Sequence, residues 1–232
     1  MNAKPATAKP RGRPRAAPDD EAGRRRQLLR ASARLFREKG YDGTSVRDIA
    51  QATGLQSGSW VYHFPTKQDI LVAVMEEGLN DALARIEAIA RLDLPPRRKF
   101  EALVRAHLDT ILAPGQDFIP VVLYEWRSLD GAALPRVTAP LRRYEAIWKQ
   151  VIRDLQRSGE WPGRTRIDAL LLFGALNWMA RWYAPDGGLD VDQLAREAVK
   201  FFLRPGKRVV GGRWSVVGKK RPRRAPTHSA SD

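Results

Sequence analysis

Residues 44–69 carry the feature that most limits what this chain can fold into, a pattern of two short helices joined by a tight turn. One buried helical face is marked by residues at the spacing i, i+3, i+4 and i+7, namely Val46, Ile49, Ala50 and Thr53. Ser45 and Asp48 have the spacing of a capping box, which predicts the start of that helix. Gly54 predicts its end, because glycine adopts the left-handed backbone conformation without steric cost. A second short helix is then expected over residues 56–63.

The second helix begins with small polar residues, Gln56, Ser57, Gly58 and Ser59. Ala50 in the first helix is small enough to let the second helix approach closely, and Leu55 fills the corner between them. Helix-turn-helix proteins place such a second helix in the DNA major groove, with its N-terminal residues against the base edges. An ordinary pair of helices in a helical domain would not explain these polar residues. The pattern therefore favours a helix that reads DNA.

The rest of the chain is predicted to be all-α, because helix-period segments alternate with turns and no stretch shows sustained strand-like alternation. A first long helix is expected over residues 20–39, and another begins after Thr66, which can cap it. Pro95 and Pro96 then break the chain. Further helices are expected near 97–113, 117–129, 136–157, 165–184 and 190–203. The total is about nine helices, of which three form an N-terminal helix-turn-helix domain and the others surround a larger second core.

Residues 20–90 resemble the TetR family of bacterial transcription regulators. As in that family, a longer helix precedes the motif, and Phe64, a turn and Thr66-Lys67 follow it. The segment GLQSGSWVYHF stands where the recognition helix of the family stands, and the later helices agree with the family in layout. The resemblance implies a homodimer that binds a double-stranded DNA operator and holds a small effector in its second domain.

The resemblance also implies which residues contact DNA. Base edges would be read by Arg47, Gln56, Ser57 and Ser59. An arginine such as Arg47 can form a bidentate contact to guanine, and a glutamine such as Gln56 can pair with adenine. Phosphates would be contacted by Thr44, Tyr62, His63 and Lys67. Val61 stands at a family tyrosine position and cannot donate a hydrogen bond, so Tyr62 is expected to supply part of that contact. His63 has the alternative of lying at the edge of the core.

The formal net charge of +15 is concentrated at the two ends of the chain, which supply 13 of these charges. Basic arms attract phosphate backbones through counterion release. The N-terminal arm contains KPRGRPR, the core of an AT-hook, so Arg11 and Arg13 are expected to enter a narrow A·T minor groove unless the arm is a solvated tail. The C-terminal arm is interpreted as a nonspecific phosphate-binding or solubilising tail. Four parts of the chain are therefore expected: a disordered basic arm (1–18), a helix-turn-helix DNA-binding domain (19–66), an effector-binding and dimerisation domain (67–203) and a basic tail (204–232).

Composition argues against several other classes of protein. The chain has no cysteine, which fits a reducing compartment, and its start lacks the apolar region of a signal peptide. Its longest uncharged apolar run, 12 residues between Asp168 and Arg181, is too short to cross a bilayer. A cytoplasmic protein with no membrane partner is therefore expected. The three histidines lie far apart, and no phosphate loop or nucleophile elbow occurs, which predicts no catalytic site, no metal and no cofactor.

The second domain is rich in large apolar side chains. Residues 170–173 are apolar on every side of their helix, so they should be buried. One face of the last two helices would serve the subunit's own core and the other a partner, in a four-helix bundle between subunits; a monomer with a thick core is the alternative. An apolar cavity with a few polar anchors is the usual form of a ligand site. The residues expected there, each of which has the alternative of a core position, are His107, Phe118, Tyr124, Glu125, Trp126, Trp148, Asn177, Trp178 and Arg181.

Residues 174–204, together with GLQSGS, resemble a TetR subgroup that senses acyl-CoA thioesters in fatty-acid and steroid-ring catabolism. This resemblance implies a hydrophobic tunnel with basic residues at its mouth, for which the chain offers Arg127, Arg142, Arg143 and Arg181. The expected function is a homodimeric repressor that leaves its operator when a small hydrophobic effector binds. The alternative is a DNA-binding or architectural protein that needs no ligand and relies on its basic arms. An enzyme is the weakest interpretation.

Overall fold

The computed structural model describes residues 18–54, 64–161 and 166–203. These residues form α-helices and one 3-10 helix, with no strand among them, which confirms the predicted all-α fold class. The elements are α1 (Pro18–Lys39), α2 (Val46–Thr53), α4 (Lys67–Arg91), α5 (Pro96–Leu112), α6 (Phe118–Tyr124), η1 (Trp126–Ser128), α7 (Leu134–Arg157), α8 (Arg166–Trp182) and α9 (Val191–Phe202). In the same part of the chain, no helix combines the length and the apolar composition that a membrane crossing needs.

Capping side chains fix where three of these helices begin. At α2 the Asp48 N–H donates to Ser45 Oγ (3.1 Å) and the Ser45 N–H donates to the Asp48 carboxylate (2.8 Å), so the predicted capping box is confirmed. The same reciprocal contact starts α4 and α9, through the pairs Thr66–Asp69 and Asp190–Gln193. Gly54 ends α2 with a left-handed backbone (φ 65°), as its position predicted.

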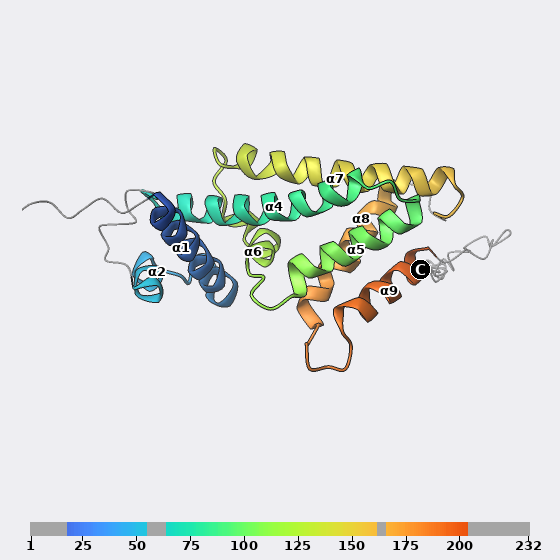
Figure 1. Ribbon diagram of the computed structural model, residues 1–232. Coiled ribbons are helices and arrows are strands. Elements are labelled where there is room, and N and C mark those ends of the chain that lie inside the picture. Colours follow the sequence, from blue (N-terminus) through green and yellow to red (C-terminus); the bar gives the residue numbers. More distant parts are fainter. Residues whose placement is uncertain (1–17, 55–63, 162–165, 204–232) are drawn as a thin grey trace, which may run out of the picture.

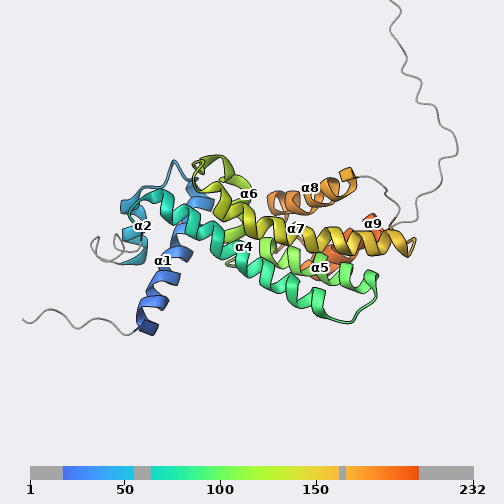
Figure 2. The same ribbon diagram turned by 90° about the horizontal axis from the view of Figure 1, so that it is seen from above.

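The long helix α4 takes part in both halves of the molecule. α1 packs against it beside the helix-turn-helix, while α5, α6 and α7 pack against it further along the chain (Figures 1 and 2). α5 in turn packs against α8 and α9. The buried side chains of α4 follow one another along most of its length and include Ile70, Leu71, Val74, Met75, Leu79, Leu83 and Ile86. Because α4 packs against α1 as well as α5, α6 and α7 within one hydrophobic core, the expected domain boundary at residue 66 stays a prediction.

The helix predicted over residues 117–129 is divided into α6 and η1. α6 ends at Tyr124 because Glu125 leaves helical geometry (φ −101°, ψ 14°). Ser128 stabilises the tighter turn that follows, since its N–H donates to the Glu125 carbonyl (3.0 Å) and its hydroxyl donates to the Glu125 carboxylate (2.9 Å). The side chain of Glu125 is thereby used within this turn.

The helix α8 has a buried face and an open face. Leu172 is fully buried, whereas Leu170 and Leu171 are 63% and 62% exposed. Leu170 and Leu171 are exposed because α8 packs on its own subunit with one face only, and the expectation that a partner covers the other face stays a prediction. The open face of α8 presents large apolar side chains to solvent, and so does Phe201 of α9. We call this patch the α8–α9 surface; it comprises Ile167, Leu171, Trp178, Trp182 and Phe201.

Candidate DNA-binding surface and effector cavity

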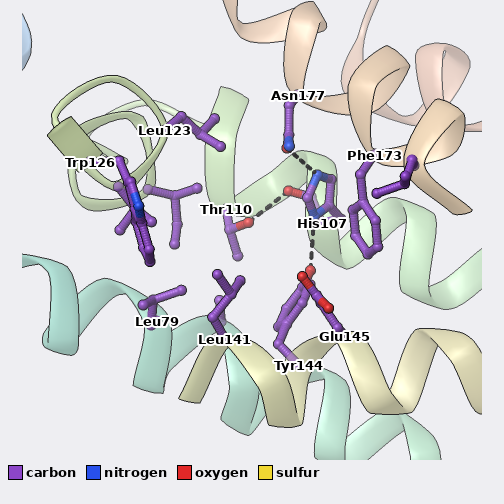
Figure 3. A pocket seen from close by; sticks show the side chains of 14 residues that line it. Leu79, His107, Thr110, Leu123, Trp126, Leu141, Tyr144, Glu145, Phe173 and Asn177 are labelled. Carbon is purple, nitrogen blue, oxygen red and sulfur yellow. Dashed lines mark hydrogen bonds between the residues drawn. The ribbon is translucent and has the colours of Figure 1, made fainter. Parts of the chain in front are cut away.

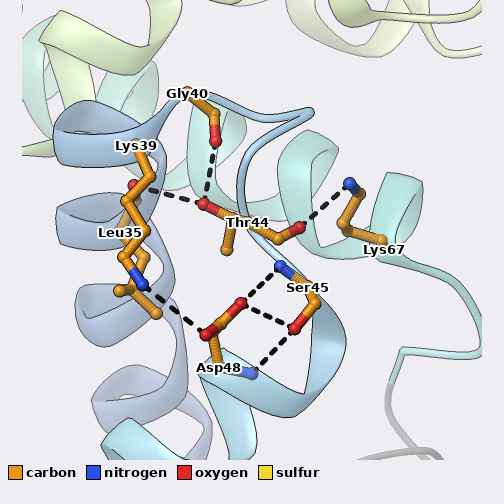
Figure 4. A network of polar contacts seen from close by, with 7 residues as sticks. All are labelled: Leu35, Lys39, Gly40, Thr44, Ser45, Asp48 and Lys67. Atoms are coloured by element: carbon orange, nitrogen blue, oxygen red, sulfur yellow. Dashed lines mark hydrogen bonds and ion pairs between the residues drawn. The ribbon is translucent and has the colours of Figure 1, made fainter.

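The turn between α1 and α2 is fixed by a network of polar contacts (Figure 4). Thr44 lies in this turn with 0% of its surface exposed, and its hydroxyl lies within hydrogen-bond distance of the carbonyls of Gly40 (2.8 Å) and Leu35 (3.2 Å). Asp48 accepts hydrogen bonds from Ser45, which lower the pKa of its carboxyl, and the Lys39 ammonium at 3.5 Å lowers that pKa further. The start of α2 is thus tied to the end of α1.

Lys67 extends this network to α4. Its ammonium donates to the carbonyls of Tyr41 (2.9 Å) and Thr44 (3.0 Å) and lies 4.1 Å from the centre of the Tyr41 ring. Two of its three N–H donors are therefore used inside the domain, and one is left for another acceptor. The first turn of α4 consequently holds the turn from which α2 begins.

These positions bear on two of the expected phosphate contacts, those of Thr44 and Lys67. The Thr44 side chain is buried and its hydroxyl is bonded internally, which gives it a role inside the domain, and the phosphate contact expected of this residue stays a prediction. Lys67 has one donor left, so its contact stays a prediction. Arg47 is exposed on α2, with no hydrogen bond or ion pair to the residues that the structure describes. The other expected DNA contacts lie outside those residues: Gln56, Ser57, Ser59, Tyr62, His63, Arg11 and Arg13.

A cavity of about 330 Å³ lies in the second half of the chain (Figure 3). Its apolar walls come from α4, α6, η1, α7 and α8 and include Leu79, Ala82, Ile119, Val122, Leu123, Trp126, Leu141, Leu170 and Phe173. Its polar lining consists of His107, Thr110, Tyr144, Glu145 and Asn177. A small set of polar groups in an apolar cavity of this size is typical of a small-molecule site.

Three of the residues expected at an effector site line this cavity, namely His107, Trp126 and Asn177. Six others do not line it, namely Phe118, Tyr124, Glu125, Trp148, Trp178 and Arg181. Trp148 is fully buried behind the His107 ring, with ring centres 5.9 Å apart, and Trp178 (64% exposed) and Tyr124 (53% exposed) lie on the outer surface. Tyr144, one of the aromatic residues of the second domain, also lines the cavity, as does Phe173, which was not expected there although it precedes Asn177 by one helical turn. The role of these residues in effector binding stays a prediction.

His107 is the centre of the polar lining. Its Nδ1 lies 2.8 Å from Tyr144 Oη, its Nε2 lies 3.0 Å from Asn177 Oδ1, and its carbonyl accepts a hydrogen bond from the Thr110 hydroxyl (2.7 Å). Burial lowers the pKa of His107 to about 4, against the smaller opposing effect of its hydrogen bond to Asn177. Burial also raises the pKa of Tyr144. Both side chains are therefore uncharged at neutral pH.

Comparison with known proteins identifies the family. A sequence model described as "Bacterial regulatory proteins, tetR family" matches residues 28–74, and one described as "Tetracyclin repressor-like, C-terminal domain" matches residues 93–205. The HTH-type transcriptional repressor KstR2 of Rhodococcus jostii is 32% identical over 190 residues, which cover 79% of this chain and 91% of that protein. The matched families and this relative are transcription regulators rather than enzymes.

Two solved structures illustrate the likeness of the fold. The superantigen PfiT is 38% identical, with a TM-score of 0.66 over 78% of this chain and 96% of that one. AibR in complex with isovaleryl coenzyme A and operator DNA has a TM-score of 0.72 at 23% identity, over 78% of this chain and 98% of that one. The helix-turn-helix start at α2, the helical second half and these matches together confirm the resemblance seen in the sequence: the chain belongs to the TetR family of DNA-binding transcription regulators.

Proposed function

We propose that this protein is a ligand-responsive repressor that binds operator DNA as a homodimer and leaves it when a small effector occupies the cavity. The observation that carries the proposal is the position of α4. Leu79 and Ala82 of this helix line the cavity, and Lys67 at its start holds the turn from which α2 begins. A single helix thus contacts both the candidate effector site and the candidate DNA-binding unit.

A close contact between α4 and α6 supports coupling between the two sites. A Cβ atom placed on Gly78 would lie only 2.6 Å from Phe118 Cβ, so the two helices meet with no space for a side chain. α6 supplies three cavity residues, and its neighbour Asp117 forms an ion pair with Arg37 of α1 (3.0 Å). An effector that binds one arrangement of α4, α6 and α1 more tightly than another would shift the population between them.

The dimensions of the cavity support an acyl group as the buried part of the effector. A water molecule, which has one non-hydrogen atom, occupies about 30 Å³ in the liquid. A cavity of 330 Å³ therefore holds on the order of ten non-hydrogen atoms. A short or branched acyl chain or a small ring fits this volume, whereas the nucleotide part of coenzyme A would have to lie outside it. The likeness to AibR, which was crystallised with isovaleryl coenzyme A, agrees with an acyl-CoA effector.

The α8–α9 surface supports the homodimer. Trp178, Leu171 and Phe201 are each more than 60% exposed in the single chain, and exposed apolar patches of this kind mark protein interfaces. A second copy of the chain would cover these side chains in the four-helix bundle that the sequence predicted. Two subunits would also present two recognition helices to successive half-sites of an operator.

The alternative of a ligand-independent DNA-binding protein rests on the basic arms, which carry most of the net charge. A salt titration separates the two proposals, because binding through the arms alone would show the same affinity and the same salt dependence on selected and random DNA. A repressor would prefer the selected sequence by several orders of magnitude at the same salt concentration.

The proposal is tested by selecting DNA from a genomic pool and then measuring release of the selected site. The effector panel contains short- and long-chain acyl-CoAs, steroid-ring CoA thioesters, the matching free acids and unrelated drugs. Leu123→Trp, which fills the cavity from α6, should keep DNA binding and lose release. Tyr124→Trp, which also introduces a tryptophan but on the exposed side of that helix, is the control. Release that Leu123→Trp leaves unchanged would contradict the cavity as the effector site.

A further inference from the structure

The polar lining of the cavity forms a chain of three side chains that converge from different helices (Figure 3). His107 comes from α5, Tyr144 from α7 and Asn177 from α8, and the imidazole lies between the other two. His107 and Tyr144 are only 5% and 6% exposed. Buried polar groups are costly unless they are hydrogen-bonded, so each donor among these three side chains should face an acceptor.

The donors and acceptors can be assigned from the contacts. A neutral imidazole has one N–H and one acceptor nitrogen. Nε2 faces the Asn177 carbonyl oxygen, which can only accept, so Nε2 carries the proton and donates. Nδ1 is then the acceptor, and the Tyr144 hydroxyl donates to it. The hydrogen bonds therefore run from Tyr144 through His107 to Asn177.

This direction leaves the Asn177 amide nitrogen available. Its oxygen is used by His107, and Asn177 lines the cavity, so its NH₂ group keeps two donors that no hydrogen bond to the residues that the structure describes uses. A purely apolar ligand would cover these donors and leave them without an acceptor. This loses the free energy of the hydrogen bonds that the donors form with water when the cavity is empty. The cavity therefore favours a ligand that brings an acceptor to Asn177.

The charges around the cavity specify what kind of acceptor this is. Among the residues that the structure describes, no lysine or arginine lines the cavity, and His107 is neutral. The one ionisable carboxylate in the lining, Glu145, is paired with Lys149 on the outer side of α7 (2.8 Å). A ligand carboxylate in the cavity would lose its hydration without gaining a cation, which disfavours it strongly.

We propose that the effector places a neutral carbonyl oxygen against the Asn177 amide, and that Asn177 selects carbonyl-bearing acyl or cyclic groups over hydrocarbons and free acids. His107 and Tyr144 act as positioning residues that orient this amide. The inference rests on the proposed function in taking this cavity as the effector site. It adds to that function the polar group by which the effector is recognised.

The test compares three probes with the same number of non-hydrogen atoms: acetophenone, cumene and benzoate. Binding to the full-length protein without DNA is measured by ligand-observed NMR. The wild-type protein should bind acetophenone about 3- to 10-fold more tightly than cumene, since one hydrogen bond to a neutral partner is gained, and benzoate most weakly. Asn177→Leu should remove the preference for the ketone. Gln150→Leu, the same amide-to-isobutyl change on the exposed side of α7, should leave it unchanged.

The positioning role has a separate readout. The ¹⁵N shifts of His107 should show a neutral imidazole protonated at Nε2 at pH 7, and Tyr144→Phe should weaken that tautomer preference. An imidazolium, or a proton on Nδ1, would overturn the assigned direction. The proposal would be overturned if the wild type bound ketone and hydrocarbon equally, bound benzoate most tightly or bound no probe. It would also be overturned if the preference for the ketone survived Asn177→Leu. These measurements use no operator, so a failure of DNA release by acyl-CoAs would count against the proposed function and leave this result standing.

Discussion

Replacing His107 by glutamine should change how the stability of the protein depends on pH. His107 is buried between Tyr144 and Asn177, and burial lowers its pKa from 6.5 to about 4. Unfolding returns the imidazole to water, where its ordinary pKa of about 6.5 applies. Between these two values the unfolded state binds a proton that the folded state does not, so acid favours unfolding. Glutamine keeps an uncharged hydrogen-bonding side chain but binds no proton.

The magnitude follows from the two pKa values. Because the pKa is lower in the folded state, the cost is nearly absent at pH 7, grows as the pH falls through 6.5 and reaches its limit below about 4. The slope approaches about 1.4 kcal/mol per pH unit inside this window. Between pH 7 and pH 5 the free energy of unfolding of the wild type should therefore fall by about 2 kcal/mol more than that of His107→Gln.

The measurement is urea unfolding followed by circular dichroism at pH 7, 6 and 5, at one protein concentration because the proposed subunit association would also affect stability. The comparison uses differences between the two proteins at each pH, so groups that titrate in both cancel. His107→Gln is expected to be the less stable protein at pH 7 and to lose part of that disadvantage at pH 5. Parallel pH profiles for the two proteins would refute a buried, neutral His107.

Three further predictions concern DNA binding, helix packing and assembly. Arg47→Ala should cost roughly 1–3 kcal/mol on the operator and little on random DNA, measured by fluorescence anisotropy, because its exposed side chain is expected to read a base. Gly78→Ala should lower the free energy of unfolding by about 1–3 kcal/mol, because the added methyl group overlaps Phe118. Trp178→Glu should dissociate the proposed dimer in sedimentation experiments, because it places a charge on the α8–α9 surface.

Each of these has an outcome that contradicts it. Equal losses on operator and random DNA would make Arg47 a phosphate contact rather than a base contact. Unchanged stability of Gly78→Ala would show that α4 and α6 can separate without cost, which would weaken the proposed coupling. A wild-type protein that sediments as a monomer, or a dimer unaffected by Trp178→Glu, would remove the α8–α9 surface as the interface.

Local sequence signals predicted the fold well because their physical causes lie within a few residues. The capping box of Ser45 and Asp48 and the cap at Thr66 depend on side chains three residues apart, so their spacing fixes them. The division of α6 from η1 was not predicted, because it depends on how Glu125 and Ser128 share hydrogen bonds in a turn. No periodicity in the sequence distinguishes that turn from a continued helix.

The cavity was only partly predictable because residue type does not tell which side of a helix a side chain occupies. Trp148 and Trp178 were equal candidates, yet one is buried behind the cavity and the other lies on the outer surface. Tyr144 lies on the same face of α7 as Trp148, four residues before it, and lines the cavity. Whether Tyr144 or Trp148 points into the cavity depends on the register between α5, α7 and α8. One sequence does not fix that register.

The contacts of Lys67 have a consequence for protein engineering. Two carbonyls of the α1–α2 turn depend on a donor from α4, and the buried residues Ile70, Leu71 and Val74 of the same helix follow directly. A fragment cut at residue 66 would lose all of these at once, so it should not fold independently. A chimera that joins this DNA-binding unit to the effector domain of another protein therefore needs its junction inside α4, beyond Val74. The foreign effector domain must then pack the N-terminal part of α4 into its own core.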